Sequence, residues 1–285
     1  MYFAARLILF TLAHLPRAAA FRLARAYTAA LDFALPRLRR VALRNLELAG
    51  YRPDERAPIV DGVFRSIARM MVMFARFPQM TRDNIGEWIR YDGLEHFHEA
   101  KRRGRGVLFA AAHLGNWELS AFAHGLLTEP MNVVVRPLDH ARVDALVEQR
   151  RALSGNRLIG KKEAARAILR ALQCNEAVGV LIDQNATLDE GVFVDFFGVP
   201  ACTGAAFTRI AHRAGATVIP GFALWSEDEG RYVLRFYPPV EMTGDAVADT
   251  QRMHAQLEAV VRQYPDQWLW IHRRWKTRPP GEPPI

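Results

Sequence analysis

The sequence predicts an α/β fold in which a mostly parallel central sheet is flanked by helices. From residue 106 onward, short apolar runs alternate with helix-like segments, the pattern of parallel strands joined by helical crossovers. Half of the 285 residues are hydrophobic, enough for one sizeable core. Without a low-complexity linker or repeat, we expect one domain at residues 51–285 behind a distinct region at 1–50.

Each element has its own sequence pattern. The expected strands are the apolar runs at 106–112, 131–135, 177–182, 217–224 and 232–237. Helices are expected at 116–127, 141–153, 162–173, 203–214 and 246–263. Residues 59–77 predict another helix, because apolar residues recur at helical spacing there. Its methionines, Met70, Met71 and Met73, are typical of a core-facing helix, although a lipid-binding groove has a similar composition.

The N-terminal region carries most of the charge. Residues 1–44 hold eight arginines and one acid, Asp32, and so account for +7 of the net +8. Their apolar runs are shorter than the roughly 20 residues of a membrane span. Ala18, Ala19 and Ala20 resemble the cleavage site of a secretory signal peptide, but Arg17 directly before them argues against that interpretation. We expect an amphipathic helical segment on an anionic membrane surface. A helical layer packed on the body, with solvated arginines, is the alternative. No nucleic-acid-binding motif follows.

Polar residues follow three of the expected strands. Ligands of α/β sheets bind beyond the carboxyl ends of the strands. That rule selects His113 after the first strand, Arg136 after the second and Asp183 after the third. We therefore expect these three side chains to converge at one edge of the sheet.

His113 and Glu118 form an H-x-x-x-x-E pair, a spacing that also occurs at His124 and Glu129. Context favours the first pair, because Asn116 is a suitable N-cap that places Glu118 in the first helical turn. An imidazole held by a carboxylate is a general base. A buried histidine beside a helix cap would give the same pattern, so both interpretations stay open here.

The chain lacks several motifs of other reaction classes. It has no G-x-S-x-G nucleophile elbow, no H-E-x-x-H or clustered Cys/His pattern, and no G-x-x-x-x-G-K-[ST] loop. We therefore expect neither a metal nor another cofactor. A base without its own nucleophile must activate one from a substrate, such as a hydroxyl.

Five ordered blocks carry a family resemblance. They are HLGNWE at 113–118, VVVRPLDHARVDALVEQRRALSG at 133–155, VGVLIDQNATLDEGVFVDFFGVPACTGAA at 178–206, TVIPGF at 217–222 and PDQWLWIHRRWKTRP at 265–279. Together they resemble the bacterial lipid A late acyltransferases, the lauroyl/myristoyl transferase family within the lysophospholipid acyltransferase superfamily. The N-terminal 50 residues match loosely, through LRRVALRNLELA.

The resemblance implies a glycerol-phosphate acyltransferase-like fold and transfer of a fatty acyl group. The donor would be acyl carrier protein and the acceptor a hydroxyl of a lipid A precursor, a glycolipid of lipopolysaccharide. The protein would be peripheral or monotopic on the cytoplasmic face of the inner membrane. His113 would be the base and Glu118 its partner, with backbone N–H groups near Gly115 stabilising the oxyanion.

Other residues of these blocks acquire expected roles. Arg136 and Arg151 would contact a phosphate or another anionic group of the acceptor, and Asp183 and Gln184 would orient an arginine or the sugar. Two groups of further candidates belong to the site: Gly115 and Asn116 for substrate binding, and Trp117, Phe196 and Phe197 as walls of an acyl channel. The tryptophans of the last block suit an interfacial belt or a terminal strand packed on the sheet: Trp268, Trp270 and Trp275.

Three alternatives keep part of this interpretation. The same chemistry could act on another membrane lipid, such as a glycerophospholipid, an aminolipid or another glycolipid. A hydrolase would release the acyl group to water. A non-catalytic membrane-binding relative would keep the fold alone, which the intact HLGNWE sequence argues against.

Overall fold

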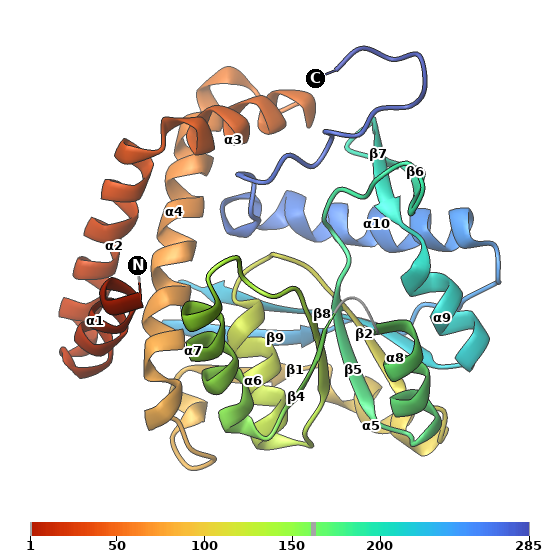
Figure 1. Ribbon diagram of the computed structural model, residues 1–285, viewed down its shortest axis with the longest axis horizontal. Helices are drawn as coiled ribbons and strands as arrows, with labels where there is room; N and C mark the ends of the chain where they lie inside the picture. The colour runs from red at the N-terminus through yellow and green to blue at the C-terminus, as the bar shows by residue number, and fades with distance from the viewer. Residues whose placement is uncertain (1, 161–163, 285) are drawn as a thin grey trace.

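The computed structural model describes residues 2–160 and 164–284 (Figure 1). Its helices are α1 (Tyr2–His14), α2 (Arg17–Ala34), α3 (Pro36–Leu48), α4 (Pro53–Arg76), α5 (Leu94–Arg102), α6 (Trp117–Leu127), α7 (Ala141–Arg151), α8 (Ala164–Gln173), α9 (Ala206–Ala214) and α10 (Ala246–Gln263). Its strands are β1 (Ile89–Asp92), β2 (Val107–Ala111), β3 (Asn132–Val135), β4 (Arg157–Gly160), β5 (Ala177–Leu181), β6 (Gly191–Phe196), β7 (Val199–Gly204), β8 (Thr217–Ser226) and β9 (Arg231–Phe236).

The central sheet has seven strands in the order β1-β9-β8-β2-β5-β3-β4. All neighbours are parallel except β8 and β9, which form an antiparallel pair. The predicted α/β class with a mostly parallel sheet is therefore confirmed. The sequence prediction missed the four-residue strands β1 and β4, and also the separate β6–β7 hairpin. Because residues 199–204 pair with β6, α9 begins at Ala206 and not at the expected residue 203. The first two residues of the helix expected at 162–173 lie outside the described residues.

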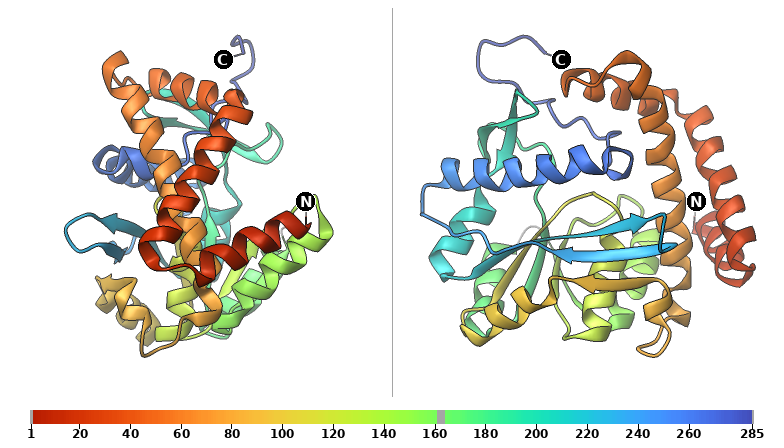
Figure 2. Two further views of the ribbon diagram at one scale, coloured as in Figure 1. Left: turned by 90° about the vertical axis from the view of Figure 1, so that its left-hand side faces the viewer. Right: turned by 180° about the vertical axis from the view of Figure 1, so that it is seen from behind.

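Helices cover both faces of the sheet (Figures 1 and 2). Alternate residues of β2 separate the two cores, since successive side chains of a strand point to opposite faces. Val107 and Phe109 pack in a core that includes residues of α5 and α6. Leu108 and Ala110 pack in another core with residues of α8, α9 and α10.

The methionine-rich segment forms the second half of α4, the long helix beside the sheet (Figure 1). Met73 is fully buried in the core, as predicted for a core-facing helix, and Met71 packs in the cluster with α1 and α2. Small residues lie where α2 packs on α4: Ala20, Ala24 and Ala68 are almost completely buried. Their short side chains allow the helices to approach closely. Within the described part of the chain, no helix combines the length and apolar character that a membrane crossing requires.

The C-terminal segment, residues 265–279, differs from its predicted environment. Trp268, Trp270 and Trp275 are 1%, 0% and 2% exposed, so an interfacial belt at these residues is wrong. Their rings fill the core between α4, α10 and the loop after β2, where burial of large aromatic surfaces is most stabilising. The segment is also not a terminal strand, since it pairs with the loop through a single bridge between Leu114 and Trp268.

Asn45 attaches α3 to this segment and generates a stability prediction. Its buried side-chain amide donates hydrogen bonds of 2.7 Å to the carbonyls of both Trp270 and His272. Asn45→Ala removes the side-chain donor from both carbonyls, and only that of His272 keeps another described donor, the N–H of Arg274. We therefore expect the free energy of unfolding to fall by about 1–3 kcal/mol in urea titrations. Arg40→Ala, on the exposed side of the same helix, is the control and should change it by less than about 0.5 kcal/mol. Equal losses in the two variants would contradict this role of Asn45.

Candidate active site

The register of β2 and β5 determines where the site forms. Ala111 lies opposite Leu181 in this parallel pair, and the N–H of Ile182 donates to the carbonyl of Ala111. Two residues further along each chain, His113 and Asp183 therefore emerge side by side at the carboxyl edge of the sheet. The convergence of these two residues, predicted from strand order, is confirmed.

Asp183 accepts three hydrogen bonds, although it is only 3% exposed. The Nδ1–H of His113 donates to Oδ1 over 2.8 Å, which fixes the tautomer of the imidazole. The backbone N–H of His113 and the indole N–H of Trp268 donate to Oδ2 over 2.9 and 2.8 Å. The Nε2 atom of His113 consequently keeps its lone pair, and the amide nitrogen of Gln184 lies 3.4 Å from it.

The pKa values of the pair move apart. Burial raises the pKa of the Asp183 carboxyl, but the charge and hydrogen bonds of His113 and the bond from Trp268 outweigh this effect, so the pKa lies well below its usual range. Burial lowers the pKa of His113, but the charge and hydrogen bond of Asp183, with the charge of Glu118, raise it above the ordinary 6.5. His113 is therefore a stronger base than a free imidazole.

Glu118 lies in the first turn of α6, as expected, because Asn116 caps this helix by accepting a 3.0 Å bond from the N–H of Leu119. The expected contact partner differs, however. Both carboxylate oxygens of Glu118 accept from Arg151, over 2.9 and 2.6 Å, whereas the carboxylate bonded to His113 is Asp183. Glu118 acts on His113 through its charge.

The loop that carries Gly115 is fixed by its backbone. Gly115 adopts φ +64°, and a Cβ there would meet the carbonyl oxygen of Ala223 at 1.9 Å, so only glycine fits. The N–H of Gly115 donates to the carbonyl of Gln267, and the N–H of Asn116 donates to the carbonyl of Ala223, both over 2.9 Å. These two N–H groups already have acceptors, so among the backbone donors near Gly115 the ones expected for an oxyanion are others than the N–H groups of Gly115 and Asn116.

The remaining candidates divide between surface and core. Arg136 and Gln184 are exposed, and Arg151 is bonded to Glu118. Phe196 and Phe197 are buried in the core, with Phe196 against the ring of Trp268 at a centroid distance of 5.5 Å. They support the site from behind, in contrast to the channel walls that the sequence suggested.

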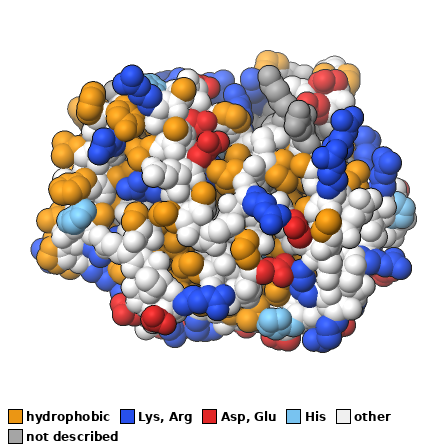
Figure 3. Space-filling view, turned by 60° about the horizontal axis from the view of Figure 1, so that its bottom comes forward, with side chains coloured by type: hydrophobic (Ala, Val, Ile, Leu, Met, Phe, Trp, Pro, Cys, Tyr) orange, Lys and Arg blue, Asp and Glu red, His pale blue; other side chains and the backbone are white. Residues whose placement is uncertain are grey.

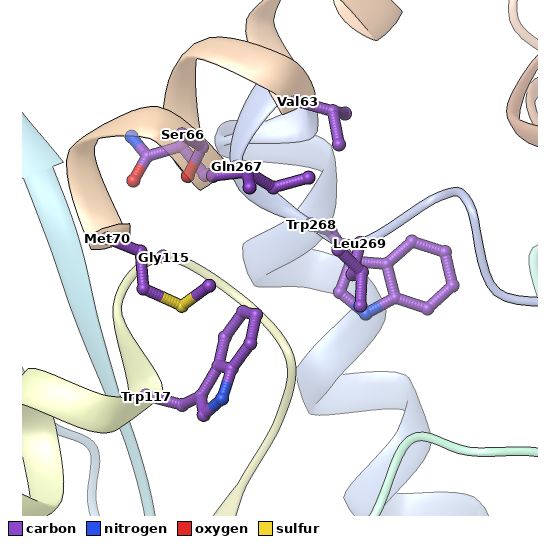
Figure 4. Close-up of a pocket in the computed structure, with 9 residues that line it drawn as sticks. Val63, Ser66, Met70, Gly115, Trp117, Gln267, Trp268 and Leu269 are labelled. Carbon is purple, nitrogen blue, oxygen red and sulfur yellow. The ribbon is translucent and has the colours of Figure 1, made fainter. Parts of the chain in front are cut away.

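Trp117 does line a crevice, which lies between α4, the loop after β2 and the C-terminal segment (Figure 4). Its indole contacts the His113 ring at a centroid distance of 4.9 Å. Met70 and Leu269 contribute further apolar walls. The free space is only about 10 Å³, so an acyl chain enters only if side chains move. Met70 is suited to such movement because it is flexible and unbranched.

Residues of the C-terminal segment support the site, a role that was not predicted from the sequence. Besides Trp268, the Nε2 atom of His272 accepts a 3.1 Å bond from the N–H of Asn185, two residues after Asp183. Arg274 is fully buried and donates to the carbonyl of Cys202 over 2.8 Å and to the hydroxyl of Thr203. Burial lowers its pKa to about 10, so it stays charged at neutral pH. In the sequence, the alternation of aromatic and basic residues in this segment did not indicate that Trp268 and Arg274 are buried.

Comparisons with known proteins now identify the family. The sequence profile of the bacterial lipid A biosynthesis acyltransferases matches residues 1–277. The chain belongs to this family. It is accordingly an enzyme of the acyltransferase class.

Relatives of the chain are also named as acyltransferases. The chain is 29% identical to the lipid A biosynthesis palmitoleoyltransferase of Escherichia coli, over 87% of this chain and 82% of that protein. It is 25% identical to a lipid A biosynthesis acyltransferase of Haemophilus influenzae, over 80% and 72% of the two chains. A phosphatidylinositol mannoside acyltransferase of Mycolicibacterium smegmatis is 26% identical, over 81% and 78%.

Asp183→Asn tests the electrostatics of the site. The substitution removes the negative charge that raises the pKa of His113 and leaves one acceptor oxygen in place of two, while the burial that lowers the pKa persists. We expect NMR titration of the imidazole to show a pKa above 6.5 in the wild-type protein and a lower pKa in the variant. An unchanged pKa would contradict the assignment of Asp183 as the partner of His113.

Proposed function

We propose that this protein transfers a fatty acyl group from acyl carrier protein to a hydroxyl of a lipid A precursor, with His113 as the general base. One observation carries the proposal: the ring of a partly buried, tautomer-fixed histidine contacts Trp117, which lines an apolar crevice, in a chain of the lipid A acyltransferase family. The acyl carrier protein donor is inferred from the family resemblance of the sequence. The acceptor is inferred from the names of the relatives.

In this mechanism Nε2 of His113 takes the proton of the acceptor hydroxyl as its oxygen attacks the thioester carbonyl. The tetrahedral intermediate then collapses, the C–S bond breaks, and the imidazolium returns the proton to the leaving thiol. Asp183 holds the ring and stabilises the imidazolium that forms. Glu118 adds to this stabilisation through its charge.

Two groups are assigned to the developing charge and the acceptor. The first-turn N–H groups of Trp117 and Glu118 have no acceptor among the described residues, so we assign them to the oxyanion. Arg136 is exposed and bonds to no described residue, so we assign it to an anionic group of the acceptor. Arg151 is assigned instead to positioning Glu118, which it holds with two bonds.

A second candidate acceptor is another glycolipid, favoured by the relative named phosphatidylinositol mannoside acyltransferase. The chemistry at His113 would be the same. Mass spectrometry of the lipid product distinguishes the two, since the acyl label moves to a different lipid. A hydrolase would instead produce free fatty acid without any acylated lipid.

The N-terminal region, residues 1–50, is our proposed membrane contact, at the cytoplasmic face of the inner membrane. Large apolar side chains of α1 and α2 face solvent: Phe3, Leu7, Phe10, Leu31 and Phe33 are 78%, 62%, 60%, 39% and 90% exposed. Apolar and basic side chains intermix over this part of the surface (Figure 3). Such a combination favours an anionic lipid surface. Some arginines serve the fold instead: Arg17 donates to Gly230, and Arg39 bridges Asp32 and Asp61.

Phe3 and Phe33 test this contact without disturbing the buried side of the helices. Each phenylalanine contributes about 1.5–3 kcal/mol when its side chain leaves water. We expect the double variant Phe3→Ser, Phe33→Ser to bind anionic vesicles at least about tenfold more weakly in sedimentation assays. Val247→Ser is the control, since Val247 is 49% exposed on α10. Unchanged binding of the double variant would exclude this surface.

The central experiment incubates the protein with labelled acyl carrier protein and a lipid A precursor, with product identified by mass spectrometry. We expect His113→Gln to reduce transfer by about 10²–10⁴-fold, because the base is lost. Glu118→Gln should reduce it less, since the bond from His113 to Asp183 persists. The exposed His98, replaced by Gln, is the matched control and should retain full activity. Normal turnover by His113→Gln would refute the mechanism.

A further inference from the structure

A second opening lies away from His113, between α1, the end of α4 and α7. It is a groove of about 550 Å³, a volume typical of a small-molecule site. Figure 2 shows α1 and α7 side by side, and the two helices are in contact. Nothing in the proposed acyl transfer uses this groove.

The walls of the groove combine two kinds of side chain. Leu9, Ala13 and Leu146 provide apolar surface, and Ala75 of α4 lies fully buried beneath it. Its basic side chains are the two arginines described below and His14. Among the described residues that line it, none is acidic. The groove therefore offers positive charge beside an apolar floor.

Arg150 is the unusual member of this set. Its Nε atom is buried and has no hydrogen-bond partner, and no described carboxylate forms an ion pair with its guanidinium. Burial alone lowers its pKa from the ordinary range. A half-buried cation without a counterion is costly, and a guanidinium binds phosphate through paired N–H donors. The next residue, Arg151, shows the contrast, because Glu118 neutralises it.

Arg6 provides the second charge, from α1. Its guanidinium contacts the ring of Tyr2 at 5.8 Å and forms no ion pair with a described residue. Phe10 belongs both to the groove and to the exposed apolar stripe of α1, which also contains Phe3 and Leu7. An apolar chain that leaves the groove would therefore continue along a surface that already exposes hydrophobic groups. An inorganic anion would satisfy the arginines but leave the apolar floor uncovered.

We propose that the groove between α1 and α7 binds one anionic glycerophospholipid, with its phosphate on Arg6 and Arg150 and its proximal chain on Leu9 and Leu146. Charge complementarity and the adjoining apolar stripe select this occupant. The lipid rests on α7, one residue before Arg151, which holds Glu118. Bound lipid thus fixes the helix that positions Glu118 near His113.

The test uses dihexanoyl phosphatidylglycerol below its critical micelle concentration, so that no bilayer is present. We expect saturable binding in isothermal titration calorimetry, and at least tenfold weaker binding by Arg6→Gln and by Arg150→Gln. Arg142→Gln is the matched control, because Arg142 is exposed on α7 and does not line the groove. Thermal unfolding of each variant verifies that the fold is retained. Because Arg6 is exposed, its substitution tests the site even if replacement of the half-buried Arg150 destabilises the protein.

Three results would overturn the proposal. Equal binding of dihexanoyl phosphatidylcholine would show no selection for an anionic lipid. Equally tight binding of inorganic phosphate would reduce the groove to an anion site. Absent binding, or equal weakening by Arg142→Gln, would exclude these residues as the site. The assay contains no acyl donor or acceptor, so its outcome is independent of whether the proposed acyl transfer occurs.

Discussion

The buried carboxylate of Asp183 connects three parts of the chain that are remote in sequence. It accepts from the backbone and imidazole of His113 at the end of β2, and from the indole of Trp268 in the C-terminal segment, while its own position is set by β5. A charge at 3% exposure is costly unless all its acceptor sites are used. The strand register, the loop after β2 and the C-terminal segment together supply the donors that this buried carboxylate requires.

The C-terminal segment supports the loop after β2 as well as the carboxylate. The N–H of Leu269 donates to the carbonyl of His113, and the N–H of Gly115 donates to the carbonyl of Gln267. Asn45 of α3 in turn holds the segment from its other side. The contacts that hold His113, the proposed base, in one orientation are therefore supplied by elements outside the HLGNWE sequence. Positions this far from the reacting atoms still influence catalysis when they hold the base.

The N-terminal helices have a different construction. Their inner sides pack on α4 through small buried residues such as Ala24, whereas their outer sides expose Phe3 and Phe33. Helices that bury small apolar residues on one side and expose large apolar and basic residues on the other are suited to two environments, the protein core and an anionic lipid surface. The groove between α1 and α7 likewise combines apolar and basic side chains, and we propose that it binds a single lipid molecule.

The sequence alone determined the elements with strong local patterns and the HLGNWE motif that carries His113, the proposed base. The periodicity of the apolar runs predicts β2, β3, β5, β8 and β9, and the N-cap at Asn116 fixes where α6 begins. These follow from propensity and spacing within a few residues. Short strands such as β1 give too weak a pattern to be predicted.

The tertiary structure alone decided which carboxylate bonds to His113. Glu118 lies only five positions after the histidine in sequence, yet the hydrogen-bonded partner is Asp183. Parallel pairing of β2 and β5 places His113 and Asp183, 70 positions apart, side by side. Burial was likewise a tertiary outcome. Trp268 and Arg274 are shielded from water by α10 and the β6–β7 hairpin, which no local pattern around them records. Long-range register and packing depend on the whole chain, whereas periodicity depends on neighbours.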